Sequence, residues 1–102
     1  MLMTERKPAT VGEIILEEFI GPLGLSRAAL AEAMGFEAEQ VDALCDGGCG
    51  VTAATALILA RVFGNSADFW LNVQRRTDLW EALHSPEQRA RIDQAKPLAT
   101  AA

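Results

Sequence analysis

Hydrophobic residues recur every three or four positions through most of this chain, which is the spacing of one face of an α-helix. The first such stretch spans residues 11–20, and acidic side chains occupy its opposite face. Its apolar face comprises Val11, Ile14, Ile15 and Phe19. Gly21-Pro22 is expected to end this helix, because both residues disfavour helical backbone. No segment alternates apolar and polar residues with period two, so the pattern predicts an all-α fold.

Two short helices are predicted on either side of Gly35. Ser26 suits the N-cap of the first helix, and Gly35 suits the positive φ that often follows a helix C-terminus. The buried face of the first helix is expected to comprise Ala29, Leu30, Ala33 and Met34. Its two alanines would let the helices cross closely. The second helix, residues 37–45, is expected to bury Val41, Leu44 and Cys45.

Three further helices complete the predicted fold. Thr52 suits the N-cap of a helix over residues 53–63, which is apolar on nearly all sides and should therefore be the most buried one. Ser66 begins a long helix that ends near residue 83, and Ser85-Pro86-Glu87-Gln88 has the form of a capping box for a short polar helix. We expect a flexible arm (1–10), a helical domain (11–83) and a C-terminal extension (84–102).

Composition limits the class of protein. A chain of 102 residues with 50% hydrophobic residues suits one domain. The net charge of −5 excludes a strongly basic, histone-like nucleic-acid binder. The uncharged stretch 51–60 is about half as long as the roughly 20 residues a membrane-spanning helix needs. Two cysteines make no disulfide framework, so we expect a cytoplasmic protein with no membrane association.

Residues 26–46 have the layout of a helix-turn-helix, in which the second helix lies in the major groove of duplex DNA. The same layout also occurs as a plain packing unit. In the DNA-binding interpretation, the base-reading residues are Glu37, Ala38, Glu39, Gln40 and Asp42. Helix N-termini and arginines are suited to phosphate. The expected phosphate contacts are Ser26, Arg27, Thr52 and Arg61.

Short motifs spread over residues 8–82 carry a further signal. They are Val11-Gly12-Glu13-Ile14-Ile15, Pro22-Leu23-Gly24-Leu25-Ser26, Ala29-Leu30-Ala31 with Gly35, Gly50-Val51-Thr52 with Thr55-Ala56-Leu57 and 59–64, and Phe69-Trp70-Leu71-Asn72-Val73-Gln74 with Asp78-Leu79-Trp80. Together they resemble the HigA-type antitoxins of bacterial toxin–antitoxin modules, a branch of the Xre/Cro-like helix-turn-helix proteins. The last motif is the most specific, because Xre domains in general lack it.

The resemblance implies both a fold and a function. The fold would be a five-helix, lambda-repressor-like helix-turn-helix domain with a short C-terminal helical extension. The protein would bind operator double-stranded DNA of its own operon as a homodimer. It would also bind and silence a small basic RelE-like ribonuclease toxin. For the dimer interface we expect one face of the long helix near the C-terminus, with Trp70, Val73 and Trp80.

The predicted recognition helix departs from the family in its charge. Residues 37–52 hold four acids and no base, whereas the family usually places basic or amide side chains here. Carboxylates oppose the approach of a polyanion, although an acidic side chain can accept a hydrogen bond from cytosine. The alternative is a helix-turn-helix retained as a protein-interaction module with weak or no DNA binding, whose acidic face suits a basic partner.

Other chemistry is not indicated by the sequence. Cys45 and Cys49 lie far along the chain from the single histidine, His84, and a zinc site needs about four ligands. Cys45 is expected in the core and Cys49 in a loop, and His84 at the surface. No nucleophile, base and orienting group recur together, and no phosphate-binding glycine loop is present. We therefore expect no metal, no cofactor and no enzymatic activity.

Overall fold

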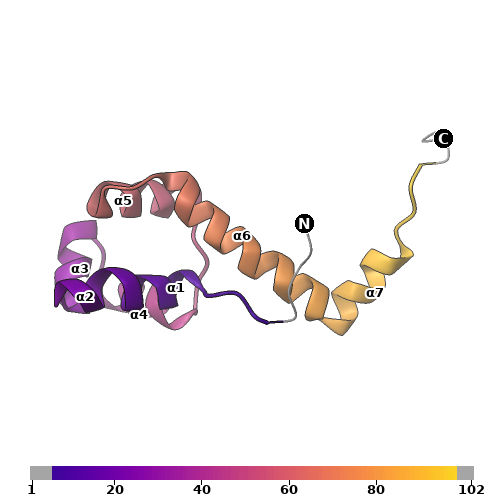
Figure 1. Cartoon of the computed structure of the whole chain (residues 1–102), viewed down its shortest axis with the longest axis horizontal. Coiled ribbons are helices and arrows are strands. Elements are labelled where there is room, and N and C mark those ends of the chain that lie inside the picture. The colour runs from indigo at the N-terminus through magenta and orange to yellow at the C-terminus, as the bar shows by residue number, and fades with distance from the viewer. Residues whose placement is uncertain (1–5, 99–102) are drawn as a thin grey trace.

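The computed structural model describes residues 6–98, and all regular elements in this range are helical (Figure 1). They are α1 (Val11–Ile14), the π-helical segment η1 (Ile15–Ile20), α2 (Gly21–Leu23), α3 (Arg27–Met34), α4 (Ala38–Asp46), α5 (Ala53–Phe63), α6 (Ala67–His84) and α7 (Pro86–Gln94). Because α1, η1 and α2 form one continuous helix, the domain has five helices and α7 follows as an extension. This arrangement confirms the predicted fold class.

The first helix does not end at Gly21-Pro22, so that prediction was wrong. A proline lacks an N–H and its ring displaces the carbonyl four residues earlier, which disrupts a regular α-helix. The chain accommodates Pro22 by widening into η1, where the Gly21 N–H donates to the Leu16 carbonyl oxygen five residues back. The helix therefore continues to Leu23 and ends at Gly24, which has a φ of 68°.

Trp70 on α6 lies at the centre of the core, with none of its surface exposed. Three phenylalanine rings surround it, with centroids 5.2 Å (Phe19), 5.8 Å (Phe63) and 4.9 Å (Phe69) from the Trp70 ring. The indole Nε1 donates to Asn65 Oδ1 over 2.8 Å, so the buried N–H is satisfied. This cluster joins the first helix, α5 and α6 into one core.

The burial of Trp70 and Val73 corrects the expected dimer interface. Both side chains are at most 1% exposed within a single chain, so they have no surface left for a second copy. They lie on the half of α6 that packs against the rest of the domain. Trp80 lies farther along α6, is half-buried and stacks on His84 with ring centroids 3.9 Å apart.

Two predicted buried faces also need correction. On α3 the buried residues are Leu30, Ala31 and Met34, whereas Ala29 and Ala33 are exposed. The helix is rotated from the expected orientation because it contacts both α4 and α5. On α5 the buried residues are Ala56 and Leu59 alone, because this helix lies at the surface against α3 and α6, and 63% of Leu57 is exposed.

The second half of α6 and all of α7 project from the domain, so the molecule measures 53 × 24 × 23 Å (Figure 1). Beyond Thr77 these two helices contain no buried residue. Large apolar side chains are exposed here, with Leu79 at 52% and Ile92 at 46%. The described part of the N-terminal arm runs back toward this projection, where Lys7 Nζ lies 5.9 Å from the centre of the Trp80 ring. In residues 6–98 no helix is both long and apolar enough to cross a membrane.

Candidate nucleic-acid interface

Helices α3 and α4 form the predicted helix-turn-helix. Ser26 Oγ accepts a hydrogen bond from the Ala29 N–H at 3.0 Å, and Gly35 ends α3 with a φ of 72°. The Phe36 N–H then donates to the Ala31 carbonyl, which closes the turn. The predicted buried face of the second helix is confirmed, since Val41, Leu44 and Cys45 all lie in the core.

All five residues predicted to read bases lie on α4 or at its N-cap. Glu37, Ala38, Glu39, Gln40 and Asp42 are all exposed. Glu37 is the N-cap, and its N–H donates to Gln40 Oε1 at 2.8 Å. This bond occupies the Gln40 amide oxygen and fixes that side chain at the start of the helix. The Gln40 amide N–H donors are bonded to no other residue within 6–98.

Arg27 lies at the start of α3 and reaches across to α4. Its Nη2 lies 2.9 Å from Asp46 Oδ1, and its Nη1 bonds both Asp46 Oδ2 at 3.2 Å and Asp42 Oδ1 at 3.1 Å. These hydrogen bonds raise the pKa of Arg27, and the Arg27 guanidinium lowers the pKa of the Asp46 carboxyl below its usual value. A predicted phosphate contact and a predicted base reader thus form one ion-paired group, which we call the Arg27 triad (Arg27, Asp42, Asp46).

Gln74 on α6 positions the loop that follows α4, a role the sequence reasoning missed. Its Oε1 accepts a hydrogen bond from the Val51 N–H at 2.9 Å, and its Nε2 donates to Asp78 Oδ1 at 2.9 Å. Thr52, which follows Val51 in the chain, is the N-cap of α5 as predicted, and its side chain accepts a hydrogen bond from the Thr55 N–H. The Gln74 contact therefore fixes the N-terminus of α5 beside α4. The one available signal was that Gln74 belongs to the most specific motif.

A hollow of about 450 Å³ lies between α4 and the start of α5. Its lining includes Phe36, Glu39, Gln40, Ala43, Thr52 and Thr55. The hollow brings two predicted base readers and the N-cap Thr52 to one surface. A helix N-terminus attracts anions because its N–H groups lack intrahelical partners. The surface therefore combines the N-terminus of α5 with the Glu39 carboxylate and the Gln40 amide.

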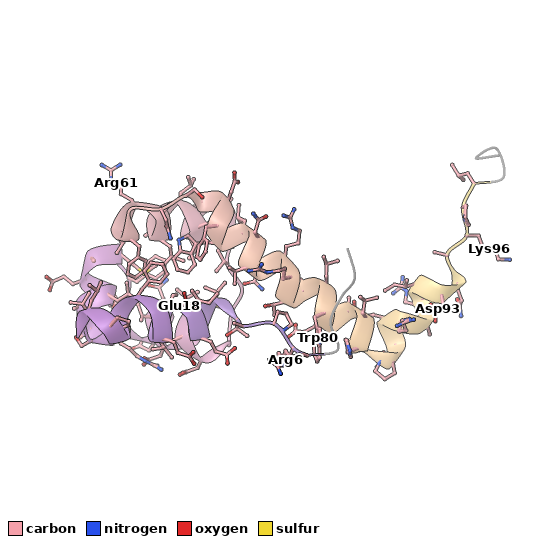
Figure 2. All side chains as sticks on the ribbon, in the orientation of Figure 1. Arg6, Glu18, Arg61, Trp80, Asp93 and Lys96 are labelled. Carbon is pink, nitrogen blue, oxygen red and sulfur yellow. The ribbon has the colours of Figure 1, made fainter. Side chains whose placement is uncertain are left out.

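Arg61 is not brought to this surface. It lies in the last turn of α5, at the opposite end of the helix from Thr52. In Figure 2 its side chain points outward from α5, on the side of the domain away from α4. Of the four predicted phosphate contacts, the structure therefore gathers Ser26, Arg27 and Thr52 near α4 and separates Arg61 from them.

The two cysteines lie in different environments, as expected. Cys45 is buried and Cys49 exposed, and both are free thiols. Burial raises the pKa of the Cys45 thiol. Within residues 6–98 no three histidine, cysteine or acidic side chains are grouped as metal ligands. His84 is exposed, and its Nδ1 lies 2.8 Å from the Trp80 carbonyl oxygen.

We predict that Ellman's reagent modifies Cys49 at least about 10-fold faster than Cys45 in the folded protein, because the reactive species is an accessible thiolate. The rates are measured on Cys45→Ser and Cys49→Ser variants, each of which retains one thiol. In denaturant both variants should react alike. Equal rates in the folded proteins would contradict the buried placement of Cys45.

Comparison with known proteins identifies relatives over nearly the whole chain. No protein-family model matches it. Antitoxin HigA-1 of Vibrio cholerae serotype O1 is 42% identical over 98 residues, which cover 96% of this chain and 90% of the relative. The structure of antitoxin GraA in complex with its operator matches with a TM-score of 0.81 and 32% identity, covering 97% of this chain and 99% of GraA.

A second solved structure supports the same assignment. Pseudomonas aeruginosa antitoxin HigA with the higBA promoter matches with a TM-score of 0.79 and 33% identity, covering 89% of this chain and 98% of that one. The identity and coverage of these matches exceed what a shared fold alone requires. With a helix-turn-helix whose second helix is exposed, they show that this chain belongs to the HigA family of helix-turn-helix antitoxins.

Proposed function

We propose that this protein is a cytoplasmic antitoxin without enzymatic activity, which represses its own operon by binding operator DNA and neutralises a small basic ribonuclease toxin. The observation that carries the proposal is the outer face of α4, which is exposed along the helix-turn-helix. Two relatives of the same fold are an antitoxin with its operator and an antitoxin with a promoter. The same surface on this chain supports DNA as its ligand.

In this proposal α4 enters the major groove, and Glu37, Ala38, Glu39, Gln40 and Asp42 face the base edges. An amide N–H can donate to a base acceptor, and an acidic side chain can accept from cytosine N4. The N-termini of α3 and α5 bind phosphates through backbone N–H groups at Ser26 and Thr52. Arg27 adds positive charge to this group, and Arg61 contributes at longer range.

The protein binds its operator as a homodimer in this proposal, with the projecting half of α6 as the interface. Leu79 is 52% exposed there, next to the half-buried Trp80. A dimer places two recognition helices on successive major grooves, about 34 Å apart. The projection suits this task because it leaves α4 free on the other part of the molecule.

Binding to the DNA upstream of its own gene tests the proposal. A fluorescently labelled duplex is titrated with wild-type protein at two salt concentrations, with a scrambled duplex for comparison. We expect specific binding that weakens steeply with salt, because phosphate contacts release counterions. Ala38→Glu should weaken this binding at least about 10-fold, since it adds bulk and charge at the groove.

The matched control is Ala90→Glu, which adds the same side chain at an exposed position of α7. It should bind as the wild type does. Equal affinity of Ala38→Glu and the wild type would show that α4 is not the recognition helix.

A second function is favoured by one observation, the absence of any base between residues 37 and 52. In that case the α4 face binds a basic protein and no longer binds DNA, since complementary charge speeds encounter and orients the partners. No binding to the upstream duplex at low salt, together with tight binding of a basic protein encoded by the adjacent gene, would favour this second function.

A further inference from the structure

The Arg27 triad places a cation from α3 on the exposed surface of α4. Asp42 and Asp46 lie one helical turn apart, and both carboxylates bond the same guanidinium. Asp46 receives two parallel N–H bonds, a geometry in which arginine is held in orientation as well as in position. The side chain of Arg27 remains 36% exposed.

The charge on α4 makes this contact important for any polyanionic ligand. Residues 37–52 supply four carboxylates and no cation of their own. Two of these carboxylates, on Asp42 and Asp46, are paired with Arg27, while Glu37 and Glu39 lie exposed at the start of the helix. The triad therefore removes part of the repulsion that the bare helix would exert on phosphate.

The hydrogen-bond inventory of Arg27 leaves donors for a ligand. A guanidinium carries five N–H groups in a planar fork. The bonds to Asp42 and Asp46 use both hydrogens of Nη1 and one of Nη2. The second Nη2 hydrogen and the Nε hydrogen make no further bond to a described residue. Both lie on a side chain that solvent can reach.

We propose that Asp42 and Asp46 are positioning residues, which hold the Arg27 guanidinium on the α4 face so that its remaining donors contact the DNA. The inference rests on the proposed function, since it specifies how this acidic helix meets DNA. Asp42 then acts by orienting Arg27, and this role replaces the direct base contact assigned to it above. Arg27 supplies the positive charge that α4 lacks.

The ionisation of the triad agrees with this role at neutral pH. The guanidinium lowers the pKa of Asp46, chiefly by hydrogen bonding. A lowered carboxyl pKa means that the pairing is present at neutral pH and is lost only as the pH falls through that lowered value. The ion pair between Arg27 and Asp46 is therefore present under the conditions in which DNA binding is measured.

The test compares two changes that each remove one negative charge from α4. Glu39→Gln removes an exposed charge, whereas Asp46→Asn removes a charge and the bidentate hold on Arg27. Each is made in the wild type and in an Arg27→Gln background, and affinity for the upstream duplex is measured by fluorescence anisotropy. In the wild type Glu39→Gln should tighten binding, because it removes a negative charge while its amide oxygen can still accept a hydrogen bond from a base. The Asp46→Asn protein should bind at least about fivefold more weakly than the Glu39→Gln protein.

In the Arg27→Gln background this difference should vanish, because no guanidinium remains to be positioned. Arg27→Gln alone should also lower the slope of log affinity against log salt by about 0.9 for each bound subunit, or about 1.8 for the dimer, as loss of one phosphate contact per subunit requires. Circular dichroism checks the fold of each variant, and we expect all of them to be folded because Leu30, Val41 and Leu44 keep the two helices packed.

The remaining outcomes overturn the proposal. Equal effects of the two substitutions in the wild type would show that the triad does not persist on DNA. A larger gain in DNA affinity for Asp46→Asn than for Glu39→Gln would show that the two carboxylates keep Arg27 from contacting DNA. If the wild type binds no upstream duplex at low salt, both the proposed function and this inference fail, whereas DNA binding without the difference overturns this inference alone.

Discussion

Replacing Gly12 by alanine is expected to lower the free energy of unfolding by about 3 kcal/mol, the upper part of the usual range for overpacking. A Cβ at this position would lie 2.1 Å from the Cys45 carbonyl oxygen and 2.8 Å from that of Leu44. Both obstacles are backbone atoms of α4, so neither can move without shifting the helix. Urea denaturation followed by tryptophan fluorescence measures the loss.

Gly48→Ala provides the matched control. A Cβ there would meet Ala43 at an ordinary distance of 3.6 Å, so the change in stability should be small. If Gly12→Ala were as stable as Gly48→Ala, the close approach of α1 to α4 would be refuted. Gly12 therefore fixes where the recognition helix lies against the domain.

Trp70→Ala should have a larger effect than Gly12→Ala, a loss of about 4 kcal/mol in the free energy of unfolding. The indole is fully buried among Phe19, Phe63 and Phe69. Its removal leaves a cavity that three rigid rings cannot fill, and it leaves Asn65 Oδ1 without its donor. Thermal unfolding followed by circular dichroism measures the change.

Trp80→Ala is the control for this prediction, because it removes the same side chain from the projecting half of α6. It should cost much less in a monomer, since Trp80 is only half-buried. Equal losses from the two substitutions would contradict the placement of the core around Trp70. Trp80 is best compared at low protein concentration, where association contributes little to stability.

Local signals made the helix boundaries predictable. Ser26, Thr52 and Ser66 each cap a helix with a side-chain oxygen, and Gly35 and Gly64 end helices with positive φ. Each of these contacts spans three or four residues, so the sequence pattern alone determines it.

Features that depend on tertiary packing were not predictable in this way. Gly21-Pro22 reads as a helix stop, yet the buried Ile15 and Ile20 keep the chain helical through a wider turn. The apolar composition of α5 suggests a central helix, although neighbours cover only one side of it. A local stretch of sequence does not determine either outcome, because each one depends on which helices pack against that face of the helix.

The candidate site also combines a feature that local sequence predicts with one that depends on tertiary packing. The exposure of the outer face of α4 follows from its amphipathic pattern, and the structure confirms it. The Arg27 triad joins residues 15 and 19 positions apart on different helices. Sequence reasoning placed Arg27 and Asp42 in separate roles because their pairing depends on the crossing of α3 and α4.

The continuity of α6 links the core to the distal tip of the molecule. From Trp70 to His84 this helix contains neither glycine nor proline, so it has no hinge of the kind these residues provide. Each residue turns an α-helix by about 100°. Inserting one amino acid after Thr77 would therefore rotate Leu79 and Trp80 by a quarter-turn or more around the axis of α6. The orientation of the part of α6 that packs in the core would stay unchanged.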